Sequence, residues 1–300
     1  MRVLVLGGEG MLGHKMYQIL RRDFQQVTCT IRGQLDDPGF SRLALFQDAE
    51  VIENFDATRF EQLEALLREL RPEVVSNCIG IVTQSQEASD AVLNIGLNAY
   101  LPHLVAQVLR EWGGRLIHYS TDCVFTGHKG RYTETDFADA PDLYGRSKWL
   151  GEVTQAANAL TLRTSIIGRE LFRFRSLLEW FLSNNHGHVK GYHGAIYSGV
   201  TTNYLAELTS RLIAEHPQLH GLYHVVSTPI SKYDLLVLLR DAYQLDVEIE
   251  ATDGKVADKS LEGSRFVAAT GYVCPPWPAL VAQLAADPTP YEAWRQPPVD

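Results

Sequence analysis

The sequence predicts an α/β fold with a doubly wound parallel sheet, followed by a smaller C-terminal substrate-binding lobe. Two observations support this. Short apolar runs alternate with amphipathic stretches through the first half of the chain, which is the pattern of β-α-β units. A glycine-rich turn at residues 7–13 separates the first apolar run from the first helical stretch, as in Rossmann-type dinucleotide-binding folds.

The predicted elements follow in chain order. Strands are expected at residues 3–6, 27–32, 50–54, 74–78, 115–120 and 160–165, and helices at 11–22, 58–70, 91–112 and from 144 onward. A long loop at 121–143 precedes the last of these helices, and ordered loops of that length are usually functional. Beyond residue 168, helices are expected at 177–183, 203–215 and 232–243 and a strand at 220–226. The proline-rich segments 274–278 and 288–300 predict an irregular tail with disordered last residues.

Length and charge fit one two-lobed unit that binds small molecules. Residues 1–165 are predicted to form a dinucleotide-binding domain, to which later segments return, and residues 166–300 mainly the substrate-binding lobe. The formal net charge of −9 argues against a sequence-independent nucleic-acid binder, which needs a basic face. An anionic cofactor stays compatible with this charge, since helix N–H groups and a few arginines can hold phosphates.

Several features predict a cytosolic protein without a membrane anchor. Glycines interrupt the first apolar run, unlike a secretory signal, and no run reaches the roughly 18 apolar residues that span a bilayer. The four cysteines form no C-x-x-C pair, so we expect reduced thiols and no disulfide framework. His186, His188 and His193 are interpreted as loop residues, because no carboxylate accompanies them at a ligand spacing. No metal site is predicted.

The glycine-rich turn predicts a dinucleotide site. Residues 7–13 read G-G-E-G-M-L-G, with glycines at the first, fourth and seventh positions. In such a turn the first glycine permits the tight bend, the second lets backbone approach a pyrophosphate, and the third lets the helix lie close to the strand. The helix start then offers unpaired N–H groups and a positive dipole end. The alternative is an ordinary strand-to-helix turn.

The end of the second strand favours NADPH over NADH. NAD-preferring sites usually carry an acid about 20 residues after the turn, which accepts the ribose 2′-hydroxyl. This strand ends at Arg32 instead, whose guanidinium would pair with a 2′-phosphate; the alternative is a solvent-facing arginine. Asp56, after the third strand, is either an adenine contact or the anchor of the helix that begins near Thr58.

Tyr144 and Lys148 stand four residues apart, hence on one face of a predicted helix. A ketone that accepts a hydride becomes an alkoxide that needs a proton, and a tyrosine releases one readily only where a cation stabilises the phenolate. Lys148 supplies that cation, and the hydroxyl of Thr121 can hold the carbonyl oxygen. Tyr-x-x-x-Lys alone is common on helix surfaces, but the phosphate turn and the loop between Thr121 and Tyr144 favour a catalytic set.

Further motifs run along the whole chain. They are S-T-D-C-V-F at 120–125, Gly130, Tyr132, Glu134, Asp136, Y-G-R-S-K at 144–148, Gly151, Glu152, Asn77, Asn98, R-T-S at 163–165 and G-L-Y-H at 221–224. Together they resemble the dTDP-4-dehydrorhamnose reductase family. The resemblance implies an extended short-chain reductase that uses NADP(H) to reduce the 4-keto group of a nucleotide-linked 6-deoxy sugar in polysaccharide precursor synthesis. It also implies Thr121, Tyr144 and Lys148 as the catalytic residues.

The turn and the resemblance together predict the contacts of the two ligands. The expected cofactor contacts are Gly7, Gly10, Met11, Leu12, Arg32, Asp56, Asn77, Cys78, Gly80, Asn98, Tyr144 and Lys148. The expected substrate contacts are Cys123, Val124, Arg163, Ile167, Arg169, Lys190 and Thr201. The basic side chains among them can pair with a diphosphate and the hydroxyl with sugar oxygens, although surface or strand-end roles are equally compatible with the sequence. A homodimer is left open.

The chain departs from the family pattern at three places. Cys123 stands where the family usually has tyrosine, Ile166 and Ile167 where it often has aromatic residues, and the segment 77–84 lacks the usual alanines. The sequence is similar to a subgroup associated with N-acetylated 6-deoxy sugars, so a UDP-linked 4-keto sugar is an alternative substrate.

Other functions share the expected fold. A 4,6-dehydratase needs an Asp-Glu pair after the threonine, and Cys123 occupies the second position here, which disfavours dehydration. A 4-epimerase recycles tightly held NAD, and Arg32, which favours NADPH, argues against this function. A non-catalytic regulatory protein is the third alternative, because a methionine adenosyltransferase subunit has this fold; the three retained catalytic residues weigh against it.

Overall fold

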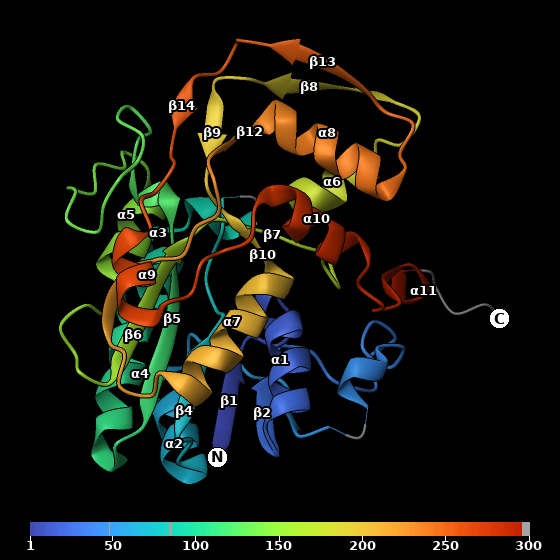
Figure 1. The fold of residues 1–300 in the computed structure, drawn as a ribbon. Helices are drawn as coiled ribbons and strands as arrows, with labels where there is room; N and C mark the ends of the chain where they lie inside the picture. The colour runs from blue at the N-terminus through green and yellow to red at the C-terminus, as the bar shows by residue number, and fades with distance from the viewer. Residues whose placement is uncertain (48, 84–85, 296–300) are drawn as a thin grey trace.

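The computed structural model describes residues 1–47, 49–83 and 86–295. Its centre is a sheet of seven parallel strands, with the glycine-rich turn at the carboxyl end of the first strand (Figure 1). The strand order across the sheet is β11 (Gly221–His224), β6 (Ala159–Thr164), β5 (Arg115–Thr121), β4 (Val74–Asn77), β1 (Arg2–Leu6), β2 (Gln26–Thr30) and β3 (Val51–Ile52). This order confirms the predicted doubly wound α/β fold.

Helices cover both faces of the sheet. Val3 and Val5 of β1 pack into the core beneath α1 (Met11–Asp23) and α7 (Thr202–Glu215). Leu4 and Leu6 point to the opposite face, into the core beneath α2 (Phe60–Leu70) and α4 (Leu101–Leu109). Successive side chains of a strand alternate between faces, so a strand buried on both sides is a continuous apolar run. That is why β1 contains no polar position after Arg2.

One long helical segment corrects the expectation about membrane spans. Residues 91–112 form α3 (Ala91–Leu93), a π-helical turn over Asn94–Tyr100, α4 and a short 3-10 turn over Arg110–Trp112. By length and composition this 22-residue segment could cross a membrane, contrary to the prediction. More than half of its most apolar 18-residue stretch is buried inside the protein, and the segment carries fully buried Asn94 and Asn98. These are properties of a core helix.

The smaller lobe lies beyond the carboxyl edge of the sheet, at the top of Figure 1. It contains α6 (Leu177–Leu182), α8 (Lys232–Tyr243), and the parallel pair β8 (His188–Tyr192) and β13 (Glu248–Thr252). A three-stranded sheet of β12 (Ile230–Ser231), β9 (Ala195–Tyr197) and β14 (Ala257–Asp258) lies beside them, and β7 (Ile166–Ile167) pairs with β10 (Val200–Thr201). Farther along the chain, α7 packs on the core of the large sheet, and β11 forms its edge strand.

The remaining elements are short, and they include the helix that carries Tyr144 and Lys148. They are 3-10 turns at Ala44–Phe46, Gln86–Ser89 and Asp122–Val124, and the helices α5 (Leu143–Leu150), α9 (Ser264–Thr270), α10 (Trp277–Ala285) and α11 (Tyr291–Arg295).

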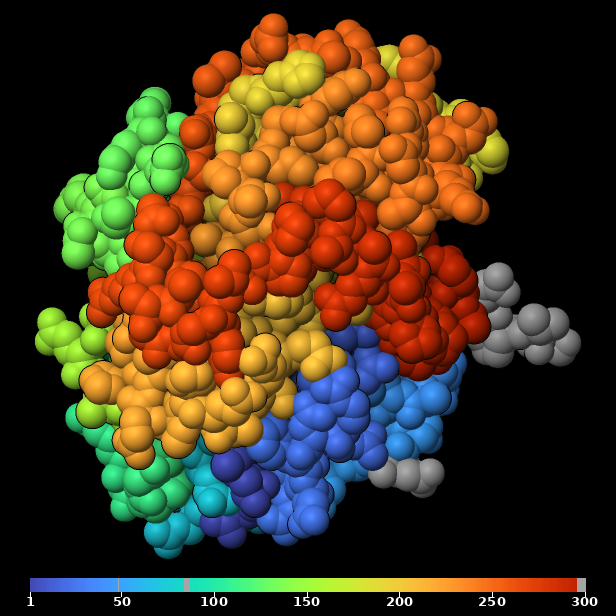
Figure 2. All heavy atoms as spheres, in the orientation of Figure 1, coloured from blue at the N-terminus to red at the C-terminus, as the bar shows by residue number. Residues whose placement is uncertain are grey.

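The tail is more regular than predicted. Helix α10 buries Trp277, Leu280 and Leu284, and the C-terminal segment lies across the surface between the small lobe and α1 (Figure 2). Two of the prolines on which the predicted irregular tail rests, Pro276 and Pro278, occupy the start of α10, where a missing N–H group costs nothing. The predicted disorder of the last residues falls on residues 296–300, outside the described residues.

Candidate functional site

A cavity of about 880 Å³ lies at the carboxyl edge of the sheet, between the two lobes. Parallel sheets bind ligands at this edge, where the strand order reverses. Twelve of the predicted site residues line it: Gly10, Met11, Leu12, Arg32, Asn77, Cys78, Gly80, Thr121, Cys123, Tyr144, Lys148 and Ile167. The other eight, Gly7, Asp56, Asn98, Val124, Arg163, Arg169, Lys190 and Thr201, do not line it. We call it the main cavity.

The phosphate turn has the close backbone approach that its glycines allow. Gly7 has a φ of +80°, and a Cβ on Gly13 would lie 1.9 Å from the carbonyl oxygen of Gly7. Gly10 faces open space, where a Cβ would meet only that same oxygen at 3.4 Å. No described side chain caps α1, so the first N–H groups of the helix are left for an anion beside Met11 and Leu12.

The end of β4 forms the wall next to the turn. Asn77 accepts a hydrogen bond from the N–H of Ile79 at 3.1 Å and thereby shapes the loop that carries Cys78 and Gly80 into the cavity. Asn98 is buried behind this loop, where its side-chain amide accepts from the N–H of Ile81 and donates to the carbonyl of Ile81. Asn98 therefore supports the predicted cofactor wall from behind.

The amide of Asn98 also connects this wall to helix α5, since it donates to the hydroxyl of Ser147 at 3.1 Å. The helix begins where Asp142 caps it by accepting from the N–H of Gly145 at 2.8 Å. A Cβ on Gly145 would lie 2.3 Å from the carbonyl oxygen of Cys123, so only glycine lets α5 approach the end of β5 so closely. This contact brings Tyr144 and Lys148 beside Thr121.

Burial controls the protonation of Tyr144 and Lys148. Burial raises the pKa of Tyr144 above its ordinary value, and the nearby Cys123 raises it further, while a hydrogen bond with Thr121 opposes the shift. Burial lowers the pKa of Lys148 to about 8, against the attraction of Glu152. The Lys148 ammonium donates to the carbonyl oxygen of Tyr119 at 2.6 Å. Near pH 7 the site therefore contains a protonated phenol and a charged lysine.

Besides Tyr144, the lining of the main cavity includes three further residues with buried polar groups: Asp122, Cys123 and Tyr197. Burial raises the pKa of Asp122 to about 6 and that of Cys123 to about 11. The hydroxyl of Tyr197 is buried and has no hydrogen-bond partner among the described residues. Tyr197 comes from β9 in the small lobe, and nothing in its sequence neighbourhood signalled a site residue.

Arg163 is committed to a buried ion pair rather than to the cavity. Its guanidinium donates to both carboxylate oxygens of Glu152, at 2.8 and 2.6 Å, and its third nitrogen lies 2.9 Å from Nε2 of His224. The Glu152 carboxylate also accepts from the hydroxyl of Ser120 at 2.6 Å. Through the bond from Ser120, this network fixes the end of β5. Val124 is likewise fully buried and packs with Phe125 and other apolar side chains.

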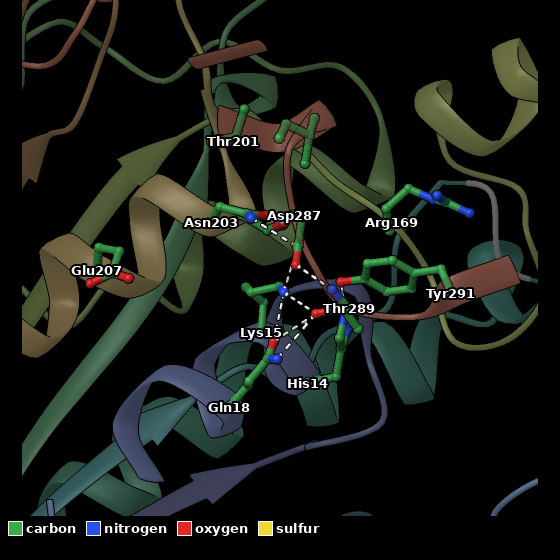
Figure 3. Close-up of polar contacts among 12 residues, drawn as sticks. His14, Lys15, Gln18, Arg169, Thr201, Asn203, Glu207, Asp287, Thr289 and Tyr291 are labelled. Atoms are coloured by element: carbon green, nitrogen blue, oxygen red, sulfur yellow. Dashed lines mark hydrogen bonds and ion pairs between the residues drawn. The ribbon is translucent and has the colours of Figure 1, made fainter. Parts of the chain in front are cut away.

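Arg169 and Thr201 lie toward the C-terminal tail, as Figure 3 shows. Arg169 pairs with the fully buried carboxylate of Glu179 at 2.8 Å and with Glu292 at 2.6 Å. The hydroxyl of Thr201 caps α7 by accepting from the N–H of Tyr204 at 3.2 Å. Both predicted substrate contacts thus have structural partners outside the main cavity.

Two more predicted contacts lie at the surface. Lys190 is exposed on β8, at the far side of the small lobe. Asp56 accepts from the N–H and the hydroxyl of Thr58, at 3.0 and 2.6 Å, just before α2. These bonds close a turn ahead of α2, whose N-cap is Arg59, and the adenine contact that the sequence also allowed for Asp56 stays a prediction.

The loop that carries Arg173 and Arg175, for which the sequence predicts no site residue, brings basic groups to the cavity instead. Arg173 and Arg175 line the main cavity, together with Phe172, which packs on Phe40 at a ring distance of 4.8 Å. Arg173 and Phe174 have φ values of 68° and 48°, a strained backbone of the kind found at binding sites. Three arginines at 169, 173 and 175 are a basic cluster that the sequence shows, but the sequence does not show which of them face the cavity.

Comparisons with known proteins give a family model and several relatives. A family model described as RmlD substrate binding domain matches residues 1–262. A probable dTDP-4,6-dihydroxy-2-methyloxan-3-one 4-ketoreductase of Streptomyces antibioticus is 31% identical over 250 residues, 78% of this chain and 75% of that protein. The dTDP-4-dehydrorhamnose reductase of Aggregatibacter actinomycetemcomitans is 25% identical over 80% of this chain and 78% of its own length.

A solved structure and a relative of another kind complete the comparison. The dTDP-4-dehydrorhamnose reductase of Bacillus anthracis, in complex with NADP, has a TM-score of 0.74 at 20% identity, covering 94% of this chain and 98% of that chain. At this identity the likeness concerns the fold. Methionine adenosyltransferase 2 subunit beta of Rattus norvegicus is 30% identical over 53% of this chain and 44% of that protein.

Proposed function

This chain belongs to the RmlD substrate binding domain family, and on that premise we propose that it is an NADP(H)-dependent reductase. Its proposed substrate is the 4-keto group of a nucleotide-linked 6-deoxy sugar, dTDP- or UDP-linked, in cytosolic synthesis of polysaccharide precursors. The observation that carries the proposal is the meeting of Thr121, Tyr144 and Lys148 with the phosphate turn in one cavity.

The residues of the main cavity fit NADP(H). The uncapped start of α1 offers N–H groups for a diphosphate, and Gly10 leaves open space beside them where a dinucleotide would lie. Arg32 stands at the end of the second strand, where it can pair with a 2′-phosphate. When bound, the cofactor supplies the hydride that reduces the sugar carbonyl.

The protein's own residues handle the proton. Thr121 orients the carbonyl oxygen, and Tyr144, whose raised pKa keeps it protonated, donates its proton to the oxygen that becomes an alkoxide. Lys148 is charged below about pH 8 and stabilises the phenolate that remains. The Lys148 bond to the Tyr119 carbonyl holds its ammonium in place.

The substrate side is proposed with different contacts from those expected. We propose Arg173 and Arg175 as diphosphate contacts, because both line the cavity. Arg163 and Arg169 are paired with buried carboxylates, whereas the partner of Arg173, Glu87, is exposed and lies 3.9 Å away. Dehydration is disfavoured, since burial raises the pKa of the Cys123 thiol to about 11 and no second carboxylate stands at that position.

The test is NADPH consumption with dTDP- and UDP-linked 4-keto-6-deoxy sugars. We expect stoichiometric oxidation, and Tyr144→Phe should lower turnover by about 10²-fold or more while leaving the dissociation constant for NADPH unchanged. Tyr100→Phe, at a half-exposed tyrosine outside the cavity, is the matched control and should keep full turnover. Turnover that survives Tyr144→Phe contradicts the mechanism, and cofactor recycling without net oxidation would indicate an epimerase.

A non-catalytic role is the second candidate, because methionine adenosyltransferase 2 subunit beta is among the proteins to which about half of this chain is similar. The same assay separates the two. A regulatory protein would bind NADPH but oxidise none of it with either class of sugar nucleotide.

A further inference from the structure

Glu9 is the acidic residue of the phosphate turn, and its side chain is held against Arg32. One carboxylate oxygen accepts from the backbone N–H of Arg32 at 2.6 Å, and the other accepts from Nε at 2.5 Å. The Glu9 side chain is 11% exposed, whereas that of Arg32 is 62% exposed. The carboxylate therefore lies in the cavity wall, next to a guanidinium that reaches into solvent.

The position of Glu9 follows from the way the turn is anchored. The N–H of Gly7 donates to the hydroxyl of Thr30 at 3.0 Å, and the N–H of Gly8 donates to the Thr30 carbonyl at 2.8 Å. These two bonds place the next residue, Glu9, over the end of β2. Glu9 and Arg32 both line the main cavity there.

This is the place where dinucleotide-binding folds distinguish a ribose 2′-hydroxyl from a 2′-phosphate. NAD-preferring sites have an acid at the end of the second strand that accepts from the hydroxyl. Here the strand brings an arginine, and the acid comes from the turn. A carboxylate in this position can accept from a 2′-hydroxyl but repels a 2′-phosphate, which is the opposite preference to that of the guanidinium.

The hydrogen bonds of Arg32 leave it able to bind a phosphate. Its Nε and backbone N–H are used by Glu9, while its two terminal nitrogens have no partner among residues 1–47, 49–83 and 86–295. Glu9 thus fixes the direction of the guanidinium and also adds a negative charge beside the phosphate that the guanidinium would bind.

We infer that Glu9 is a second determinant of cofactor choice, which opposes the preference for a 2′-phosphate that Arg32 creates. The inference rests on the proposed use of NADP(H) at this site. The affinities of the chain for NADP(H) and NAD(H) should therefore differ only slightly, because the Glu9 carboxylate and the Arg32 guanidinium act in opposite directions.

The test measures binding of two redox-inactive ligands to the purified full chain by calorimetry: ADP, and its derivative with a phosphate on the 2′-oxygen. For Glu9→Gln, which keeps the size of the side chain and removes its charge, we expect about tenfold tighter binding of the 2′-phosphorylated ligand and about threefold weaker binding of ADP. For Arg32→Met we expect about tenfold weaker binding of the 2′-phosphorylated ligand, with ADP nearly unaffected.

Glu53→Gln is the matched control. Glu53 accepts from the N–H of Leu35 at 2.6 Å in the loop that follows Arg32, but does not line the cavity, so both affinities should stay as in the unaltered protein. Equal changes for the two ligands in Glu9→Gln, or no change, would overturn the inference alone. If the unaltered chain binds neither ligand, the proposed function fails and this inference with it.

Discussion

The ammonium of Lys15 lies 2.6 Å from the carboxylate of Asp287, and their side chains are only 2% and 5% exposed. Lys15 stands on α1, the helix that starts at the phosphate turn, and Asp287 stands in the C-terminal tail (Figure 3). Thr289 of the tail accepts from Lys15 at 3.0 Å, and Tyr291 bonds to His14, which bonds to the carbonyl of Gly10. The tail, beyond the part matched by the family model, thus holds the helix that positions the turn.

Removing the acidic partner should destabilise the protein strongly. Asp287→Ala leaves the Lys15 ammonium buried without its counter-charge, so we expect a loss on the order of 3 kcal/mol in the free energy of unfolding, measured in urea. Glu64→Gln is the control, because Glu64 pairs at the surface with Arg68 on α2 and should change stability by less than about 1 kcal/mol. Equal losses in the two variants would mean that the buried pair does not hold the tail.

Replacing Arg163 should lower the stability of the protein, whereas replacing Arg173 should weaken binding of the nucleotide sugar. Arg163→Met leaves Glu152 buried and unpaired, so we expect a loss on the order of 3 kcal/mol in stability. Arg173→Met should change stability by less than about 0.5 kcal/mol, because the side chain is 46% exposed, but should raise KM for the nucleotide sugar. Thermal unfolding and steady-state kinetics check both. A raised KM in Arg163→Met at unchanged stability would restore Arg163 as a substrate contact.

Sugar reduction should weaken as the pH rises through about 8, the pKa to which burial lowers Lys148. Below that pH the ammonium is charged and stabilises the Tyr144 phenolate. Above it the charge is lost, so kcat/KM should fall about tenfold per pH unit. Rates from about pH 6 to about 10 would show this limb, and Lys148→Arg, which stays charged, should abolish it. A profile that is flat in the unaltered protein would contradict the role of Lys148.

Tyr197→Phe should affect the substrate and not the fold. Its hydroxyl is buried without a partner among the described residues, so removing it should leave stability unchanged or raise it by about 1 kcal/mol, while KM for the nucleotide sugar rises. In the control Tyr243→Phe, a hydroxyl that donates to the Leu284 carbonyl is lost, which should cost about 1 kcal/mol without changing KM. If KM is unchanged in Tyr197→Phe, that hydroxyl does not meet the sugar.

The parts of the fold and the site that the sequence predicts are those encoded by patterns among neighbouring residues. The alternating strands and helices and the glycine spacing at 7–13 identified the parallel sheet, because residue periodicity and turn chemistry act over a few neighbours. The four-residue spacing of Tyr144 and Lys148 likewise needs only one helix, and both line the main cavity. The proline-rich composition of 274–278 predicts an irregular tail, but composition does not show that Pro276 and Pro278 fall at the start of α10, where proline is compatible with a helix.

The sequence by itself thus determined the fold class, the phosphate turn and the Tyr144–Lys148 pair. Only the tertiary structure decided which charged groups are free to meet a ligand. Arg163 and Arg169 have the same chemistry as Arg173, but each is paired with a buried carboxylate, and Arg32 has Glu9 as its neighbour. The partner of a long charged side chain is set by three-dimensional packing, and residues as distant as Arg169 and Glu292 meet only once the chain has folded.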